Sequence, residues 1–238
     1  MSQRNDDKDE AQAGLSSPVS RRNLVAASVA GGLGMGLAAD PDPAKAADRT
    51  EPAVGPRGST VVEFRGRIEQ SGTTGDTFTS YGYLTNVRHT RTSDIFASST
   101  HDESTALLTA FATGDLRARV LDMSVHSLDI VGTMTIYQRV HGGAQFSDPT
   151  SFTVGDPVAR YDMVLQDILT VFSAGQGLPT LTGDMTQTRA EALSGPLAGR
   201  TFGLRGSRLR MFATGLGLLV DPVTLNANLE IAGNWSAE

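Results

Sequence analysis

Cysteine is absent from the 238 residues of this chain, and that absence excludes several kinds of chemistry. No disulfide can form, and thiol nucleophiles, iron–sulfur clusters and thiolate zinc sites are excluded with it. Stability must therefore come from a hydrophobic core rather than from covalent cross-links.

Lysine is almost as scarce, because it occurs only at positions 8 and 45. A lysine Schiff base or lysine general base is thus excluded from the rest of the chain. The formal net charge of −6 argues against nucleic acid as a partner, and no cluster of basic residues suits anionic lipid. The four histidines form no metal-binding pair at short spacing, so we expect no metal and no cofactor.

The N-terminal region carries the features of an export signal. Arg21 and Arg22 precede Leu24 and Val25, and a soft apolar run rich in Gly and Ala follows over 26–39. That run is too short for a membrane span, which needs about 20 apolar residues. An A-x-A sequence at 44–46 supplies a cleavage site.

These features predict a twin-arginine signal peptide over residues 1–46, disordered or helical, and the twin-arginine export machinery as a partner. The mature protein is then secreted, periplasmic or on the cell surface. A disordered tail with a chance arginine pair and an uncut membrane anchor are the alternatives. Prolines and charges over 47–57 predict a disordered linker, followed by a single domain over 58–238.

Alternation of apolar and polar residues indicates β-strands beyond residue 58. In the first strand Val62, Phe64 and Ile68 fall on one face, while Glu63 and Arg65 fall on the other. Turn sequences rich in Gly, Pro and Asp separate the following segments. Eight strands are predicted, over 60–69, 77–87, 104–113, 128–139, 157–172, 178–189, 201–214 and 225–235.

Eight antiparallel strands form either a closed barrel or a two-sheet sandwich. We predict an all-β fold with an eight-stranded antiparallel β-barrel, because closure removes exposed strand edges. A barrel of this size has an interior wide enough for a side-chain core or for one small ligand.

Four segments, at 132–137, 146–149, 158–161 and 181–184, resemble the allene oxide cyclase-like and dirigent-like β-barrels. The resemblance implies a partly apolar central cavity that binds a hydrophobic small molecule and steers a cyclisation or coupling. It transfers no catalytic residue to this chain.

Asp167 is the sharpest candidate for chemistry. It shares its strand face with Tyr161, Met163 and Leu165, so it is expected to point into the apolar interior. Burial raises the pKa of a carboxyl group and suits it to act as a general acid. The predicted catalytic set is Asp167, Tyr161 and Arg210. The alternatives are an outward-turned or arginine-paired Asp167 and a solvated arginine face.

The residues predicted to bind the ligand are mostly aromatic, because such side chains give a cavity an apolar wall with a polar tip. Filling of the core is the alternative reading for them. The acidic and imidazole cluster over 101–103 is expected to be a solvated loop rather than a metal site. The predicted ligand-binding residues are Tyr81, Tyr83, Tyr137, Met163 and Trp235.

Three functions remain open from the sequence. The first is an exported barrel that binds a hydrophobic or amphipathic small molecule in its interior. The second is a cofactor-free cyclase or isomerase, and the third is a structural or interaction protein of the cell surface with a solid core. Homo-oligomers are a further expectation.

Overall fold

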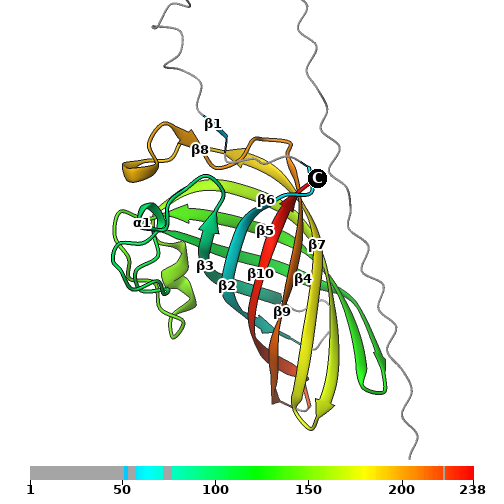
Figure 1. Ribbon diagram of the computed structural model, residues 1–238. Helices are drawn as coiled ribbons and strands as arrows, with labels where there is room; N and C mark the ends of the chain where they lie inside the picture. Colours follow the sequence, from blue (N-terminus) through cyan, green and yellow to red (C-terminus); the bar gives the residue numbers. More distant parts are fainter. Residues whose placement is uncertain (1–50, 53–56, 72–76, 222) are drawn as a thin grey trace, which may run out of the picture. The chain divides into compact units, whose positions relative to one another are not determined.

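Eight antiparallel strands follow one another around a closed barrel, in the order β10-β2-β3-β4-β5-β6-β7-β9 (Figure 1). This computed structural model describes residues 51–52, 57–71, 77–221 and 223–238. It confirms the predicted all-β fold and the eight-stranded barrel. The predicted signal peptide and most of the predicted linker lie outside the described residues. The barrel strands are β2 (Thr60–Gln70), β3 (Thr77–Val87), β4 (Leu108–Asp122), β5 (Val125–Gln138), β6 (Asp156–Ser173), β7 (Gln176–Ala190), β9 (Arg208–Asp221) and β10 (Asn226–Ala237).

Short elements lie between the barrel strands. β1 (Glu51–Pro52) pairs in parallel with β8 (Arg200–Thr201) outside the barrel. One helical turn, α1 (Thr92–Ile95), precedes β4, while the 3₁₀ turns η2 (Pro149–Thr153) and η3 (Gly195–Leu197) precede β6 and β8. No helix among the described residues is long and apolar enough to cross a membrane.

The period-two pattern places one row of each strand in the interior. In β6, for example, Tyr161, Met163 and Leu165 are buried, while Asp162 and Val164 between them are exposed. Leucine, isoleucine, methionine and aromatic side chains from all eight strands form one continuous core. Burial of this apolar surface is what stabilises a barrel that has no disulfide.

Close approach of neighbouring strands depends on paired glycines. Gly66 of β2 lies directly opposite Gly82 of β3. A Cβ atom on Gly82 would lie 2.2 Å from the carbonyl oxygen of Arg65, so a side chain at this position would force the two backbones apart. These glycines let β2 and β3 curve together toward the interior, where a larger residue would not fit.

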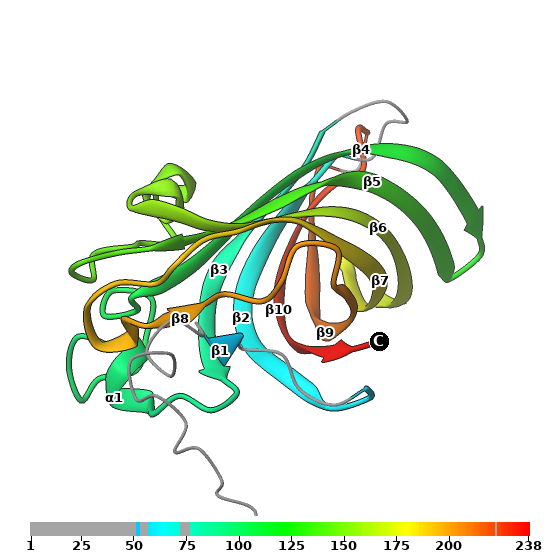
Figure 2. The ribbon, with the colours of Figure 1, turned by 90° about the horizontal axis from the view of Figure 1, so that it is seen from above.

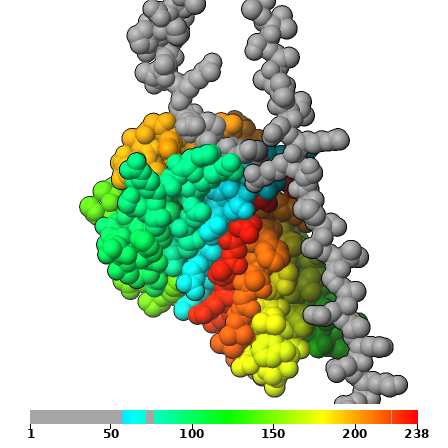
Figure 3. Space-filling model, viewed as in Figure 1, coloured from blue at the N-terminus to red at the C-terminus, as the bar shows by residue number. Residues whose placement is uncertain are grey.

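The two ends of the barrel differ. At one end, here called the plug end, the segment that contains η3, β8 and Phe202 crosses the opening, and Leu197 and Phe202 join the core (Figure 2). At the other, here called the turn end, the β4–β5, β6–β7 and β9–β10 connections reverse the chain. On the outer surface the faces of β2, β10, β9 and β7 lie side by side (Figure 3).

Two predicted strands begin and end elsewhere in the structure. The strand predicted over 104–113 is β4, Leu108–Asp122, because the backbone N–H of Ala106 donates to Asp102 in a turn that occupies 102–107. The strand predicted over 201–214 is β9, Arg208–Asp221. Gly203 and Gly206 have positive φ angles of 73° and 87°, so the chain turns there instead of extending.

Candidate functional site in the barrel interior

The centre of the barrel is nearly filled by side chains. A cavity of about 30 Å³ remains there, lined mainly by apolar residues that include Met163, Leu165, Leu181 and Trp235. Since one water molecule needs roughly 10–15 Å³ of such space, this cavity holds at most two or three waters. The central region therefore acts as a packed core more than as a binding chamber.

A larger cavity of about 110 Å³ lies at the turn end. Its walls are mostly apolar and include Leu128 of β5 and Leu169 of β6. Four polar side chains also line it: Gln70 at the end of β2, Arg119 of β4, His126 of β5 and Gln176 at the start of β7. We call this space the end cavity. It combines an apolar wall with a few polar groups, which is the usual composition of a small-molecule site.

Asp167 of β6 lines neither cavity, although its strand neighbours Leu165 and Leu169 line the central and the end cavity. Its side chain is fully buried at 0 % exposure, and it faces the interior as predicted. In the strand register it lies between Leu128 of β5 and Leu181 of β7. Leu128 lines the end cavity and Leu181 lines the central cavity, so Asp167 is packed in the layer of side chains between them.

Neither carboxylate oxygen of Asp167 has a hydrogen-bond partner among the described residues. Burial raises the pKa of this carboxyl group to about 7, and the backbone N–H of Thr180, acting as a weak donor to it, opposes the shift. Buried carboxyl groups in proteins are normally paired or hydrogen-bonded, so an unpartnered one calls for a ligand or an ordered water.

Other interior polar atoms share this property. The side-chain oxygen of Gln70 and the indole Nε1 of Trp235 are also buried without a hydrogen-bond partner among the described residues. Gln70 lines the end cavity, and Trp235 lines the central one. The interior thus offers both acceptors and a donor that a bound molecule or water can satisfy.

Two cationic groups contribute to the electrostatics of the end cavity. Desolvation lowers the pKa of Arg119 below its usual value. Desolvation, with a smaller contribution from the charge of Arg119, also lowers the pKa of His126, so the imidazole favours its neutral form at neutral pH. The positive charge at this end therefore comes mainly from Arg119.

The structure does not bring the three predicted catalytic residues together. Tyr161 faces the interior, as does Asp167, but six residues of strand separate them, which is about 20 Å. Arg210 lies on the outer face of β9, where its Nη1 forms a 3.0 Å ion pair with Asp184. None of the three lines the end cavity.

The predicted ligand-binding residues divide between the two faces of the barrel wall. Met163 and Trp235 line the central cavity, as expected. Tyr81 and Tyr83 pair in register with Arg67 and Arg65, and their rings lie outside the barrel. There they pack against the loop residue Phe146, at ring-centroid distances of 6.1 and 6.3 Å.

The hydroxyl group of Tyr81 donates a 2.8 Å hydrogen bond to Glu69. Burial and, to a smaller extent, this carboxylate raise the pKa of Tyr81 to about 12. Tyr137 also faces outward, since its neighbours Ile136 and Gln138 are the buried ones. Tyr137 therefore does not line the interior. Tyr81 and Tyr83 border the central cavity, although their rings pack against the outer loop.

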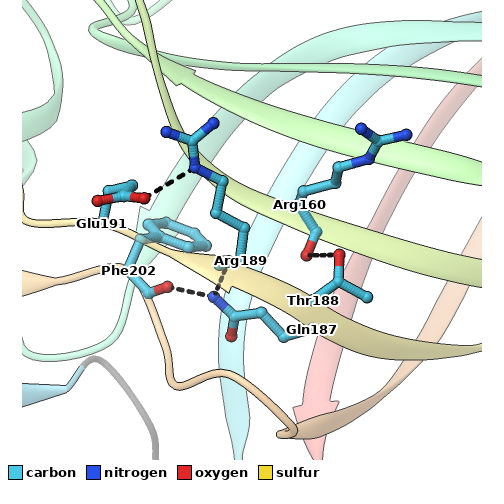
Figure 4. A network of polar contacts seen from close by, with 6 residues as sticks. All are labelled: Arg160, Gln187, Thr188, Arg189, Glu191 and Phe202. Carbon is cyan, nitrogen blue, oxygen red and sulfur yellow. Dashed lines mark hydrogen bonds and ion pairs between the residues drawn. The ribbon is translucent and has the colours of Figure 1, made fainter.

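A polar network closes the plug end (Figure 4). Gln187 of β7 is buried, and its side-chain nitrogen donates to the carbonyl oxygens of Phe202 and Arg189 at 2.6 and 2.9 Å. Beside it, Arg189 and Glu191 form an ion pair at 2.8 Å. These contacts fix the crossing segment over the opening, which leaves the turn end as the place where the interior comes nearest to solvent.

The cluster over 101–103 forms a structured loop. The ring of His101 packs against Phe96 with a centroid distance of 4.8 Å. Asp102 accepts hydrogen bonds from the hydroxyl and backbone N–H groups of Ser104, at 2.7 and 3.0 Å. Across the part of the chain that the structure describes, no three histidine, aspartate or glutamate residues are grouped as metal ligands.

Gln70, Arg119 and His126 were not among the residues predicted from the sequence. Gln70 is in phase with Phe64 and Ile68, and His126 is in phase with Leu128. A polar residue at the end of an apolar row was the signal that could have identified them. Arg119 carries no such signal, because a register irregularity between Leu116 and Ala118 breaks the alternation before it.

Comparison with known proteins adds no assignment, since the chain matches no family model, no curated protein and no solved structure.

Proposed function

We propose that the protein binds a small hydrophobic or amphipathic molecule inside the turn end of its barrel. The observation that carries the proposal is the cavity of about 110 Å³ at the turn end, where a mostly apolar wall includes a few polar side chains. An apolar cavity of about 150 Å³ in another protein holds a benzene molecule. The end cavity is smaller than that, so the ligand expected here is no larger than a single ring.

The sequence supports a location for this activity. We propose that the twin-arginine signal exports the folded protein, so that it holds its ligand outside the cytoplasm. A barrel without disulfides can fold before export and needs no oxidant to do so.

The cyclase or isomerase alternative has weaker support. Asp167 has the raised pKa of a general acid, but it does not line the end cavity. Tyr161 and Arg210 do not line that cavity either. If the end cavity holds only water, the protein is instead expected to be a structural or interaction protein of the cell surface with a solid core.

Native mass spectrometry of the protein purified from its own host tests the binding proposal directly. We expect a bound species of low mass that is lost when the end cavity is filled by the substitution Leu169→Trp. The matched control is Val131→Trp, because Val131 belongs to the adjacent strand β5 but is 39 % exposed on the outer face.

The control variant is expected to retain the bound species. An identical spectrum for the wild-type protein and the Leu169→Trp variant, or an empty wild-type protein that also fails to bind toluene, would overturn the proposal.

The outer surface supports self-association as a further proposal. Along the adjacent strands β6, β7 and β9, the outward-facing residues near the turn end carry no charge. The next two strands around the barrel, β10 and β2, carry Glu230 and Arg67, which form an ion pair. We propose that a second copy of the chain covers this surface, here called the uncharged face. Its apolar and hydroxyl side chains are typical of a protein–protein interface, whereas binding to anionic lipid would require basic residues, which this face lacks. The uncharged face consists of Val164, Gln166, Ile168, Thr170 and Phe172 of β6, Leu178, Thr180 and Thr182 of β7, and Phe212, Thr214, Leu216 and Leu218 of β9.

A further inference from the structure

The lining of the end cavity includes a basic side chain and no acidic one. Arg119 lines it, together with the titratable residue His126, and no aspartate or glutamate is found among the described residues of the lining. In the β4–β5 register Arg119 lies opposite Leu128, which is buried and lines the same cavity. The end cavity thus combines an apolar wall with a guanidinium group from β4.

A second polar group in this lining is buried. Gln70 is only 6 % exposed, and its Oε1 atom has no hydrogen-bond partner among the described residues. Rotation of the side-chain amide by half a turn would place the NH₂ group where Oε1 now lies, so this side chain can either accept or donate. Because a buried polar atom without a partner is costly, Gln70 favours a bound molecule that carries a polar group.

The chemistry of these groups favours a carboxylate on that molecule. A planar guanidinium group matches a carboxylate with two parallel N–H···O hydrogen bonds. The single negative charge of a carboxylate balances the charge of Arg119, whereas a phosphate group with about two negative charges would leave an excess beside an apolar wall. An ammonium group would instead meet the positive charge of Arg119 in a site of low polarity, where like charges repel strongly.

The interior carboxyl group of Asp167 lies outside this arrangement. Leu128 stands between Asp167 and Arg119 in the strand register, so the two backbones are about 10 Å apart across the sheet. Asp167 does not line the end cavity. Its repulsion of a bound carboxylate therefore acts over a longer distance than the attraction of a guanidinium group in direct contact.

We infer that the end cavity binds a small monocarboxylate whose charged group pairs with Arg119 and whose hydrocarbon part packs against Leu128 and Leu169. This inference rests on the proposed function and specifies the ligand class at the same site. The cavity volume of about 110 Å³ limits the ligand to about the size of benzene. Butanoate has about as many non-hydrogen atoms as benzene and is therefore a suitable probe.

Three probes that share a propyl chain and differ in their polar group test the inference: butanoate, butanamide and butylamine. Binding of each to the full-length protein is measured by NMR titration at pH 7 and constant ionic strength. We expect butanoate to bind at least about tenfold more tightly than its neutral isostere butanamide, since hydrogen bonds between charged groups contribute that much. Butylamine should bind most weakly of the three.

Substitutions of two arginines on the same strand separate a direct contact from a change in overall charge. Arg119→Met removes the charge but keeps an unbranched side chain, so the preference for butanoate over butanamide should be lost. Arg119→Lys keeps the charge, so the preference should remain. Arg117→Met is the matched control, because Arg117 is exposed and forms an ion pair with Asp115 at 3.3 Å. It loses the same charge and should keep the preference.

The outcomes distinguish this inference from the proposed function. Equal binding of butanoate and butanamide to the wild-type protein, or tighter binding of butylamine, would overturn the inference and leave the proposed function intact. Loss of the preference in Arg117→Met as well as in Arg119→Met would overturn the assignment to Arg119. Failure of all three probes and of toluene to bind would overturn both claims. Circular dichroism checks the folding of each variant, and the wild-type comparison keeps the test informative if Arg119→Met does not fold.

Discussion

Leu181 lies directly opposite Asp167 across the β6–β7 pairing, so an ionisable carboxyl group faces a fully buried leucine in the barrel interior. The neighbour on the other side, Leu128, is equally apolar. This environment determines how the stability of the protein depends on pH, because only the neutral form of the carboxyl group is tolerated at low cost.

The expected pH dependence follows from the pKa of Asp167, which burial raises from 3.8 to about 7. Between these two values the folded state keeps a proton that the unfolded state has lost, so stability falls as pH rises. Below about pH 4 there is no penalty, and above about pH 7 the full penalty applies. At about 1.4 kcal/mol per pKa unit, that penalty is on the order of 4 kcal/mol.

We therefore expect Asp167→Leu to increase the free energy of unfolding at pH 8 by several kcal/mol, and to increase it much less at pH 4.5. Urea denaturation at the two pH values measures the difference. Asp167→Asn serves as the non-titrating control and should show a flatter pH profile than the wild-type protein. Parallel profiles for the wild-type and Asn proteins would contradict the assigned pKa.

Gly203 controls the plug end of the barrel. Its φ angle is 73°, and a Cβ atom added to it would lie 2.1 Å from Oε1 of Gln187. Because Gln187 anchors the crossing segment, we expect Gly203→Ala to reduce the free energy of unfolding by about 1–3 kcal/mol. The buried Trp235 is the only tryptophan, so its fluorescence reports the loss of the folded barrel.

Gly195→Ala is the matched control for this substitution. Gly195 also has a positive φ, 58°, but nothing lies within 4 Å of its added Cβ atom. It should show the cost of the backbone conformation alone, so it should destabilise less than Gly203→Ala. Equal effects of the two substitutions would mean that the Gln187 contact contributes little.

The alternation of apolar and polar residues was sufficient to predict the barrel, because strands with one buried and one exposed face repeat their signal every second residue. The inward position of Asp167 followed from the same rule. The pattern failed where charged residues pair within a sheet. The second half of β4 contains Arg117, Arg119 and Asp122, looks like a loop in the sequence, and nevertheless pairs with β5.

Tyr81 and Tyr83 show a second limit of prediction from the alternation of apolar and polar residues. Residues 81–84 of β3 are all buried, because the loop around Phe146 and Phe152 covers the outer face of this strand. Alternation cannot tell inside from outside when both faces are covered. The end cavity was likewise not predictable, since its size depends on how residues of seven strands meet at the turn end.

If a second copy of the chain binds the uncharged face, one charged residue placed on that face should dissociate the oligomer. Phe212 lies on this face and is 45 % exposed. If a second copy covers it, Phe212→Glu should shift the sedimentation coefficient toward that of the monomer, because a buried unpaired charge is costly. Ala232→Glu is the control, since Ala232 is exposed on the neighbouring strand β10 near Glu230 and Asn234. A wild-type protein that sediments as a monomer at all concentrations would contradict the proposal.

The last prediction concerns Arg21 and Arg22, which lie outside the described residues. A twin-arginine signal is read by a receptor as a specific sequence and not as two positive charges. Replacing both residues by lysine should therefore keep the charge and abolish export, so that the folded protein accumulates in the cytoplasm of a bacterial host. Arg4→Lys is the control and should be exported normally. Fractionation measures the distribution, and N-terminal sequencing of the exported protein should give a start at Ala47. Export of the double-lysine variant at the wild-type level, or an exported chain that begins at Ser2, would show that the arginine pair is not part of a twin-arginine signal peptide.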